Sequence, residues 1–349
     1  MTAHTCAPGI PGREAPGGHD GDPGTLRKLP EMRCADAARM RDEPLKASAV
    51  RYSRFLLLEV PSAWGPSALE GAHMEAGIAR ELDRLAAAAD RHVLLIRRPG
   101  RHPSADPSAG SEPRAWALAD TSPGAEHVVW GSWRDPADLL RLDLSAAIPG
   151  PGVTRGSRQL ALVCTNGKRD QCCAVRGRPV AAAIAANTDW DTWECSHLGG
   201  HRFAATIMLL PTGDMFGWLD PESAVEVTRR FTAGQLMLSH YRGRCGQPVP
   251  VQAALHAAAV RLGDFNRDAI RVAWTRCLPA EADSGPPQGA PGDAERWEVR
   301  VIHQGTNGRE DAYHLVMGGA TLAPTFLSCA DGIRRAEVHY EALSFTKVG

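Results

Sequence analysis

The chain has 349 residues, 43% of them hydrophobic, which is enough to bury the cores of two or three domains. The 39 Lys and Arg residues are balanced by 40 Asp and Glu residues, and this near-neutral charge argues against nucleic acid or an anionic membrane as a partner. Because the sequence has no basic leader followed by an apolar run, and no apolar run of bilayer length, we expect a cytoplasmic protein outside the membrane.

Residues 1–30 are dominated by Gly, Pro and polar side chains, which predicts a disordered tail. Residues 31–148 predict an N-terminal α/β domain, whose centre is a β-α-β unit. The elements we expect in this domain are a short helix at 36–41, strands at 54–60 and 92–96, an intervening helix with Met74, Ile78, Leu82 and Leu85 on one stripe, strands at 116–119 and 127–130, and a short helix that begins at Asp135 and Pro136.

The Pro- and Gly-rich residues 147–156 predict a linker, followed by a second domain at 157–246. The pattern there is β-α-β followed by β-β-α, which is the order of elements in the thioredoxin core. We expect strands at 159–163 and 192–195, a helix that Pro179 opens and that runs through Ala186, a hairpin of strands at 204–210 and 215–219, and a helix capped by Asp220 that runs to Phe231.

Residues 247–349 predict a C-terminal helix and a small α+β region. The helix at 250–262 ends at Gly263, and after a polar segment at 279–295 the apolar residues at 297, 299 and 301 alternate with charged ones, as in a half-buried strand. The expected fold is therefore α/β, with a thioredoxin-like domain preceded by a second β-α-β domain and followed by an α+β appendage.

Two segments hold most of the residues that are suited to chemistry. They are CTNGKRDQCCAVRGRP at 164–179 and WECSHLGGHRF at 193–203. Eight residues separate Cys164 from Cys173, and three separate His197 from His201. Iron in a 2Fe-2S cluster is ligated by thiolate or imidazole, and these two pairs supply the four ligands that the cluster needs. The two glycines between the histidines favour a loop, because each costs roughly 1 kcal/mol relative to Ala within a helix.

Two other kinds of protein remain open at this point. A structural zinc-binding module also uses Cys and His ligands, although the 23 residues between Cys173 and His197 exceed the spacing of about a dozen in a zinc finger. A thiol-disulfide or peroxide-reducing enzyme of thioredoxin fold would use Cys172 and Cys173. No Cys-x-x-Cys motif precedes the predicted helix, and that chemistry leaves the histidine pair without a role.

The two motifs resemble the sucrase/ferredoxin-like family, actinobacterial members especially, whose segments look like C-T-x-G-x-R-D-x-C-C-A and W-E-C-S-H-x-G-G-H-R-F. The resemblance extends more weakly from about residue 34 to residue 252. It implies a thioredoxin-like ferredoxin domain, with an unknown redox protein as partner, and an electron carrier rather than an enzyme. The ligands of the 2Fe-2S cluster that it implies are Cys164, Cys173, His197 and His201.

Sucrase activity, which the family name suggests, finds no support in the sequence. A glycosidase needs two carboxylates about 5 to 10 Å apart, and no such pair stands out. Asp170 and Glu194 flank the ligand segments, where they could orient an imidazole or an arginine, or form a local salt bridge or loop cap. Asn166 departs from the family, many members of which carry His at this position.

Two more thiols compete for the role of ligand. We favour Cys173 over its neighbour Cys172, and we expect Cys195, at the end of a strand, to be a buried apolar thiol. Four arginines near the motifs could dock an acidic electron donor, donate hydrogen bonds or be solvated surface residues: Arg169, Arg176, Arg178 and Arg202. The remaining cysteines are scattered and have no assigned function: Cys6, Cys34, Cys245, Cys277 and Cys329.

Overall fold

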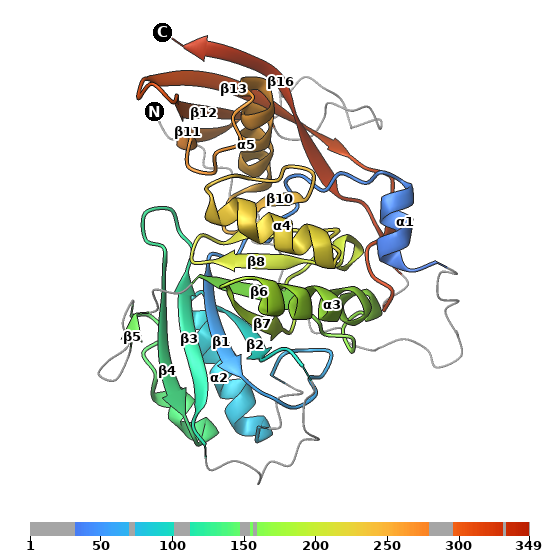
Figure 1. Cartoon of the computed structure of the whole chain (residues 1–349), viewed down its shortest axis with the longest axis vertical. Helices are drawn as coiled ribbons and strands as arrows, with labels where there is room; N and C mark the ends of the chain where they lie inside the picture. Colours follow the sequence, from blue (N-terminus) through green and yellow to red (C-terminus); the bar gives the residue numbers. More distant parts are fainter. Residues whose placement is uncertain are drawn as a thin grey trace.

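The computed structural model describes residues 32–69, 74–100, 112–146, 154–155, 159–278, 296–330 and 333–348. Within them a ten-stranded sheet and a four-stranded sheet organise the fold (Figure 1). This mixed arrangement of strands and helices confirms the predicted α/β class. The predicted tail at 1–30, most of the predicted linker at 147–156 and the polar segment at 279–295 lie outside the described residues.

Nearly every predicted element has a counterpart in the described part of the chain. The first half contains α1 (Cys34–Met40), β1 (Arg54–Glu59), α2 (Ala76–Ala88), β2 (His92–Arg97), β3 (Arg114–Asp120), β4 (His127–Trp133), the 3-10 helix η1 (Pro136–Arg141), β5 (Thr154–Arg155), β6 (Leu160–Cys164), α3 (Gln171–Asn187) and β7 (Asp191–Cys195). The second half contains the 3-10 helix η2 (His201–Phe203), β8 (Ile207–Leu210), β9 (Asp214–Phe216), α4 (Pro221–Thr232), β10 (Tyr241–Arg244), α5 (Val249–Leu262), β11 (Ile270–Leu278), β12 (Arg296–Gln304), β13 (Glu310–Thr321), β14 (Thr325–Phe326), β15 (Arg334–Arg335) and β16 (Val338–Val348).

The ten-stranded sheet runs through both of the predicted α/β domains. Its strand order is β10-β9-β8-β6-β7-β2-β1-β3-β4-β5. β1 and β2 are parallel neighbours joined through α2, and β6 and β7 are parallel neighbours joined through α3, so each half holds a β-α-β unit. The halves meet where β2 pairs antiparallel with β7. The two predicted domains therefore contribute to one sheet, and the domain boundaries themselves stay a prediction.

The sheet curls, so that one of its faces packs against itself. Alternate residues of a strand point to opposite faces, and the first face carries Leu57 of β1 and Leu162 of β6 in one core. Trp130 of β4 and Trp193 of β7 are four strands apart in the sheet order, yet their rings stack with centroids 5.7 Å apart. Both halves of the sheet thus enclose a single core.

Helices cover the opposite face of the sheet. α2 packs on Leu56 and Leu58 of β1, while α3 and α4 pack on Val163 of β6 and Leu209 of β8. Helix α4 begins at the predicted cap, since Asp220 accepts a hydrogen bond from the N–H of residue 223 at 2.8 Å. The helices that flank the ligand segments are therefore anchored on the sheet by apolar contacts.

A buried ion pair reinforces the short seam between β2 and β7. These strands share two paired positions, and at one of them Arg97 faces Glu194. Arg97 Nη2 lies 2.8 Å from Glu194 Oε2, and the two side chains are 6% and 3% exposed. The hydroxyl of Thr165 donates to the same carboxylate oxygen at 2.9 Å. Of the roles considered for Glu194, the binding of an arginine is the one that the structure shows.

The C-terminal module consists of α5 packed on the sheet β11-β12-β13-β16. As predicted, α5 ends at Gly263, which has φ +65°, and Val299 and Val301 of β12 are buried. Between β13 and β16 the chain leaves this sheet and runs down past α1 toward α3 (Figure 1). We call the described residues of this excursion, 322–330 and 333–337, the C-terminal arm. It carries the short ribbon of β14 and β15.

Helix α3 begins eight residues earlier than predicted, at Gln171 instead of Pro179. The prediction was wrong because Asp170 caps the helix, accepting a hydrogen bond from the N–H of Cys172 at 2.9 Å. Pro179 instead lies inside the helix, where its missing N–H leaves the carbonyl of Val175 without a helical donor. Val175 is 53% exposed, so water can serve that carbonyl. The correction places Cys172 and Cys173 in the first turn of a helix.

Gly177 lets α3 approach the end of β6. A Cβ atom at this position would lie 2.2 Å from the carbonyl oxygen of Cys164, which is far too close. Gly77 in α2 is a matched control, because its Cβ would meet the Glu75 carboxylate first, at 3.7 Å. We expect Gly177→Ala to lower the free energy of unfolding by about 1 to 3 kcal/mol through overpacking, and Gly77→Ala to raise it by up to about 1 kcal/mol. Urea unfolding measures both changes; a stabilised Gly177→Ala would contradict the tight seating of α3.

Candidate metal centres

Cys164 is the last residue of β6, and strand pairing fixes its position. Its N–H donates to the carbonyl of Thr206 at 3.1 Å, and it faces Cys195 across the parallel pair with β7. Its Sγ donates to the carbonyl of Ser196 at 3.6 Å. The residue is 1% exposed. Strand β6 therefore delivers a buried thiol at the carboxyl end of two parallel strands.

Cys173 lies in the first turn of α3, where the helix dipole favours a thiolate. Its N–H donates to the carbonyl of Asp170 at 3.2 Å, and its Sγ lies 3.6 Å from Nδ1 of His201. The residue is 2% exposed. The early start of α3 is what brings this thiol to the end of β6.

His197 and His201 flank the predicted glycine loop after β7, and His201 is the first residue of η2. Gly199 and Gly200 between them have φ of +70° and +71°, a left-handed conformation that suits glycine. The two imidazole rings stack with centroids 4.4 Å apart. The glycines thus reverse the chain so that both rings lie on the same side of the loop.

Arg242 of β10 holds this loop in place. Its Nη1 donates to the carbonyl of Gly199 at 3.0 Å, and its Nε donates to the hydroxyl of Ser48 at 3.0 Å. The side chain is fully buried, and burial, followed by the charge of Arg202, lowers the pKa of Arg242 to about 9. At neutral pH the guanidinium therefore remains a buried cation. Arg242 follows the second motif by about forty residues and belongs to no motif of its own, so nothing in the sequence pointed to it.

The structure brings all four predicted ligands together. In addition to the contact between Cys173 and His201, the thiol of Cys164 is hydrogen-bonded with Cys173 and with His197. The bond with Cys173 is the main reason that the pKa of Cys164 lies well below its usual value, and the same contact raises that of Cys173. Burial lowers the pKa of His197 to about 4, so its imidazole is neutral at pH 7, the form that binds metal ions.

Within this group, Nδ1 of His197 is buried and has no hydrogen-bond partner among the described residues. An unsatisfied buried polar atom costs about 1 to 3 kcal/mol. His201 is 8% exposed, whereas His197 is half-buried and is thus the member of the group closest to solvent.

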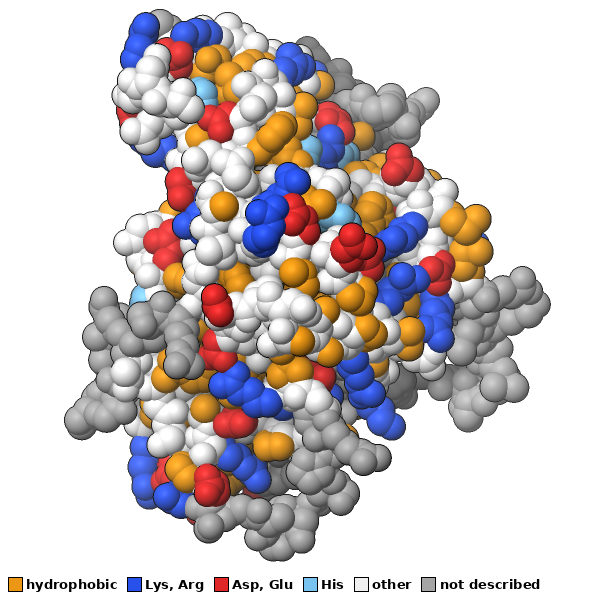
Figure 2. Space-filling view, in the orientation of Figure 1, with side chains coloured by type: hydrophobic (Ala, Val, Ile, Leu, Met, Phe, Trp, Pro, Cys, Tyr) orange, Lys and Arg blue, Asp and Glu red, His pale blue; other side chains and the backbone are white. Residues whose placement is uncertain are grey.

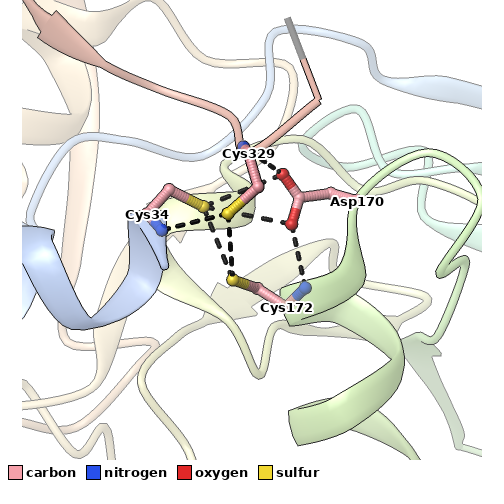
Figure 3. A group of neighbouring side chains, drawn as sticks. All are labelled: Cys34, Asp170, Cys172 and Cys329. Carbon is pink, nitrogen blue, oxygen red and sulfur yellow. Dashed lines mark hydrogen bonds between the residues drawn. The ribbon is translucent and has the colours of Figure 1, made fainter. Parts of the chain in front are cut away.

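A second group of metal-ligating side chains surrounds the same helix start, and we call it the Cys/Asp cluster (Figure 3). Cys34 comes from the start of α1, Asp170 and Cys172 from the start of α3, and Cys329 from the C-terminal arm. Sγ of Cys172 lies 3.6 Å from that of Cys34 and 3.7 Å from that of Cys329. All four ligand atoms lie within 4.8 Å of one another, so the Cys/Asp cluster could hold one metal ion.

Asp170 connects the parts of the Cys/Asp cluster. Besides capping α3 through Oδ1, it accepts hydrogen bonds at Oδ2 from Ser328 Oγ at 3.0 Å and from Cys329 N–H at 2.8 Å. The N–H of Cys34 donates to Sγ of Cys329 at 3.1 Å. Hydrogen bonds with Cys172 and Cys34 hold the pKa of Cys329 far below its usual value, at about 2. Of the roles considered for Asp170, the structure shows that of a cap, and it adds the contact with the C-terminal arm.

No function was predicted for Cys34 or Cys329. The two residues are 295 positions apart, and neither belongs to a spaced motif. The signal that could have pointed to them was the number of cysteines left over in a chain expected to be reduced. Cys172 and Cys173 are adjacent in a helix, so their side chains point about 100° apart. Cys173 accordingly packs with Cys164, and Cys172 packs with Cys34.

Three of the other residues singled out in the sequence, Arg176, Arg202 and Asn166, have structural partners. Arg176 pairs with Asp36 of α1, and Arg202 is buried between Glu43 and Glu337, so it is not a solvated surface residue. Arg178 is exposed, as the surface alternative requires. Asn166 donates to the carbonyl of residue 65 at 2.9 Å, and Cys195 is a fully buried thiol whose pKa is raised by burial.

Charges of both signs are interspersed over the face of the molecule in Figure 2, in agreement with the near-neutral sequence. None of the helices in the described residues has both the length and the apolar character that a membrane span requires.

The segment that contains the candidate cluster ligands matches a known protein family. Residues 45–243 match the family model described as Sucrase/ferredoxin-like, over more than half of the chain. The chain belongs to the sucrase/ferredoxin-like family. The match contains Cys164, Cys173, His197 and His201, whereas Cys34 and Cys329 of the Cys/Asp cluster lie outside it. No curated protein and no solved structure matches the chain.

The role of Arg242 can be tested by mutation. Arg242→Met would leave the carbonyl of Gly199 and the hydroxyl of Ser48 without their donor, and we expect the free energy of unfolding to fall by about 1 to 3 kcal/mol. Arg229→Met on the exposed surface of α4 is the control and should change it by less than about 0.5 kcal/mol. Denaturant unfolding compares the two variants, and equal effects would show that Arg242 does not hold the loop.

Proposed function

We propose that this protein transfers electrons through one 2Fe-2S cluster held by Cys164, Cys173, His197 and His201. The observation that carries the proposal is the convergence of these four side chains. They come from the end of β6, the first turn of α3 and the loop after β7, and they meet in one buried place.

The donor set suits such a cluster. Two thiols and two imidazoles provide the four ligands, and both residue types serve as cluster ligands in proteins. A metal ligand bond would also satisfy Nδ1 of His197, the buried atom that lacks a partner among the described residues. The Cys ligand of α3 is Cys173 in this proposal, because Cys172 contacts Cys34 and Cys329 instead.

The topology supports a thioredoxin-like ferredoxin domain around this site. The unit β6-α3-β7 is followed by β8-β9-α4, and in the sheet these strands have the order β7-β6-β8-β9. β6 is parallel to β7 and antiparallel to β8, as expected for β-α-β followed by a β-hairpin. In this proposal the strands before residue 148 and the module after residue 246 are additions to that domain.

When bound, the cluster supplies reversible one-electron transfer, and two imidazole ligands place its potential in the range of Rieske centres, roughly −150 to +300 mV. The chain's own residues balance the charge of the thiolates. The N-terminus of α3 lies at Cys173, and the charges of Cys164 and Cys173 act to raise the pKa of the buried Arg242. Cationic Arg242 in turn favours the thiolate form of both ligands.

Electrons enter and leave beside His197 in this proposal, because it is the ligand closest to solvent. Arg169 is near enough to lower the pKa of His197, and Lys168 beside it is exposed. These cations suit a redox partner protein with an acidic docking surface. A reducing, cytoplasmic location suits the free thiols of the site.

The thiol-disulfide alternative is less well supported. It needs an accessible nucleophile, whereas Cys172 and Cys173 are both buried and face different neighbours. A sucrase is also poorly supported, since Asp170 caps a helix and Glu194 is bound by Arg97.

Iron and sulfide analysis tests the proposed ligands. Purified anaerobically from iron-supplied cells, the protein should be red-brown and contain about two iron atoms and two acid-labile sulfides per chain. Cys164→Ser and His201→Ala should lose most of both, because each removes a ligand. Cys195→Ser is the matched control, since this buried thiol faces Cys164 across the strand pair, and it should retain both. A folded wild-type protein without colour or sulfide would end the proposal.

The midpoint potential tests whether imidazole is a ligand. In His201→Cys a thiolate replaces a neutral ligand, so the added negative charge should lower the potential by on the order of 100 mV. A redox titration followed by visible absorbance measures the change, with Cys195→Ser again as control. An unchanged potential in His201→Cys, with the cluster retained, would show that His201 is not a ligand.

A further inference from the structure

The Cys/Asp cluster is not used by the proposed electron transfer. It joins three parts of the chain that are far apart in the sequence: the start of α1, the start of α3 and the C-terminal arm. Cys34, Asp170 and Cys172 are buried, and Cys329 is half-buried. Three thiols and a carboxylate crowded together in this way need either protons or a metal ion between them.

The spacing of the ligand atoms matches a tetrahedral zinc site. A Zn–S bond of about 2.3 Å gives an S···S edge of about 3.8 Å in a tetrahedron. The two S···S distances at Cys172 are 3.6 and 3.7 Å, and Sγ of Cys34 lies 3.7 and 3.9 Å from the oxygens of Asp170. A disulfide would instead need the sulfur atoms at about 2 Å. The distances between these sulfur and oxygen atoms are thus close to the edges of a tetrahedron around one zinc ion.

The hydrogen bonds leave room for a metal ligand once Cys34 is a thiolate. The thiol of Cys34 donates to both oxygens of Asp170, and these two bonds end when the thiol loses its proton. Oδ2 then accepts two hydrogen bonds, from Ser328 and Cys329, while Oδ1 accepts one, from the N–H of Cys172. A carboxylate oxygen has two lone-pair positions, so Oδ1 can also bind an ion. The N–H of Cys34 points at Sγ of Cys329, the kind of contact that orients a thiolate ligand.

We propose that Cys34, Cys172, Cys329 and Asp170 bind one Zn²⁺ ion with a structural role. Cys34 and Cys172 release their thiol protons to solvent when their Zn–S bonds form, while Cys329 and Asp170 bind in their anionic forms and no redox change occurs. Three thiolates favour a thiophilic ion over Mg²⁺ or Ca²⁺, and four protein ligands leave no open position for catalysis. The ion fastens the C-terminal arm and α1 to the helix that carries Cys173.

The zinc site is separate from the proposed 2Fe-2S ligands. Cys172 and Cys173 are adjacent, but their side chains leave the helix in different directions and join different groups. Arg176, one turn after Cys172 on α3, pairs with Asp36 of α1, so the same two helices are also joined by charge. This inference does not depend on the proposed electron transfer.

Metal analysis of the full-length protein tests the proposal. Protein purified anaerobically from cells supplied with zinc and iron should contain about one zinc per chain. Cys34→Ser and Cys329→Ser should lose it and keep their iron, while Cys164→Ser should lose iron and keep zinc. Cys245→Ser, at a buried thiol next to Thr121, is the control and should keep both metals. Cys329→His, which retains a ligand, should keep zinc even if the serine variants fold poorly.

A second measurement uses Co²⁺ in place of zinc. Zinc-depleted wild-type protein that retains its iron should, on titration with Co²⁺, develop sulfur-to-cobalt charge-transfer absorption and reach saturation at one equivalent. Cys329→Ser should not develop it. The proposal is overturned if the wild type lacks zinc, if iron occupies this site, if both serine variants keep zinc, or if mass spectrometry finds a disulfide between any two of the three thiols.

Discussion

The N-terminal half of α3 rests against the carbonyl of Cys164 at Gly177, and both groups of candidate metal ligands depend on this contact. Gly177 permits this contact, since the Cβ atom of any larger residue would lie 2.2 Å from the carbonyl oxygen of Cys164. Asp170 sets the start of the helix, and the strand sets the position of Cys164. If the helix began at Pro179, Cys172 and Cys173 would lie in a loop without a fixed direction. The helix start thus decides which thiol faces which partner.

The site also depends on parts of the chain distant in sequence. The loop with His197 and His201 is held by Arg242 of β10, whose other partner is Ser48 before β1. The curled sheet makes such contacts possible, because it brings the first strands of the chain over the strands that carry the ligands. The C-terminal arm adds Cys329 and Glu337 from the other end. A family match over residues 45–243 therefore covers the candidate iron ligands but only part of what surrounds them.

Local sequence signals predicted most elements, and long-range packing accounts for what they missed. The caps of α4 and α5 and the alternation along β12 were readable, because each depends on residues within one turn or strand. The four expected ligands stood out as two spaced pairs, and the structure places these pairs in contact. Their role as ligands stays a prediction. The start of α3 was misplaced because Pro179 is a common first-turn residue and its exposed position inside the helix could not be foreseen. No periodic pattern in a single sequence reveals that the two halves join into one sheet. Nor does any such pattern reveal that Cys34 meets Cys329.

Pulsed electron paramagnetic resonance of the reduced protein, grown with ¹⁵N-labelled histidine, most directly tests whether two imidazoles and two thiols hold a diiron centre. Two histidine ligands should give two distinct ¹⁵N hyperfine couplings, both of which are replaced by ¹⁴N couplings when the histidine is unlabelled. His197→Ala, if it retains iron, should show at most one. A reduced iron–sulfur signal in the wild type without any histidine nitrogen coupling would contradict the account, because all ligands would then be thiolates or other donors.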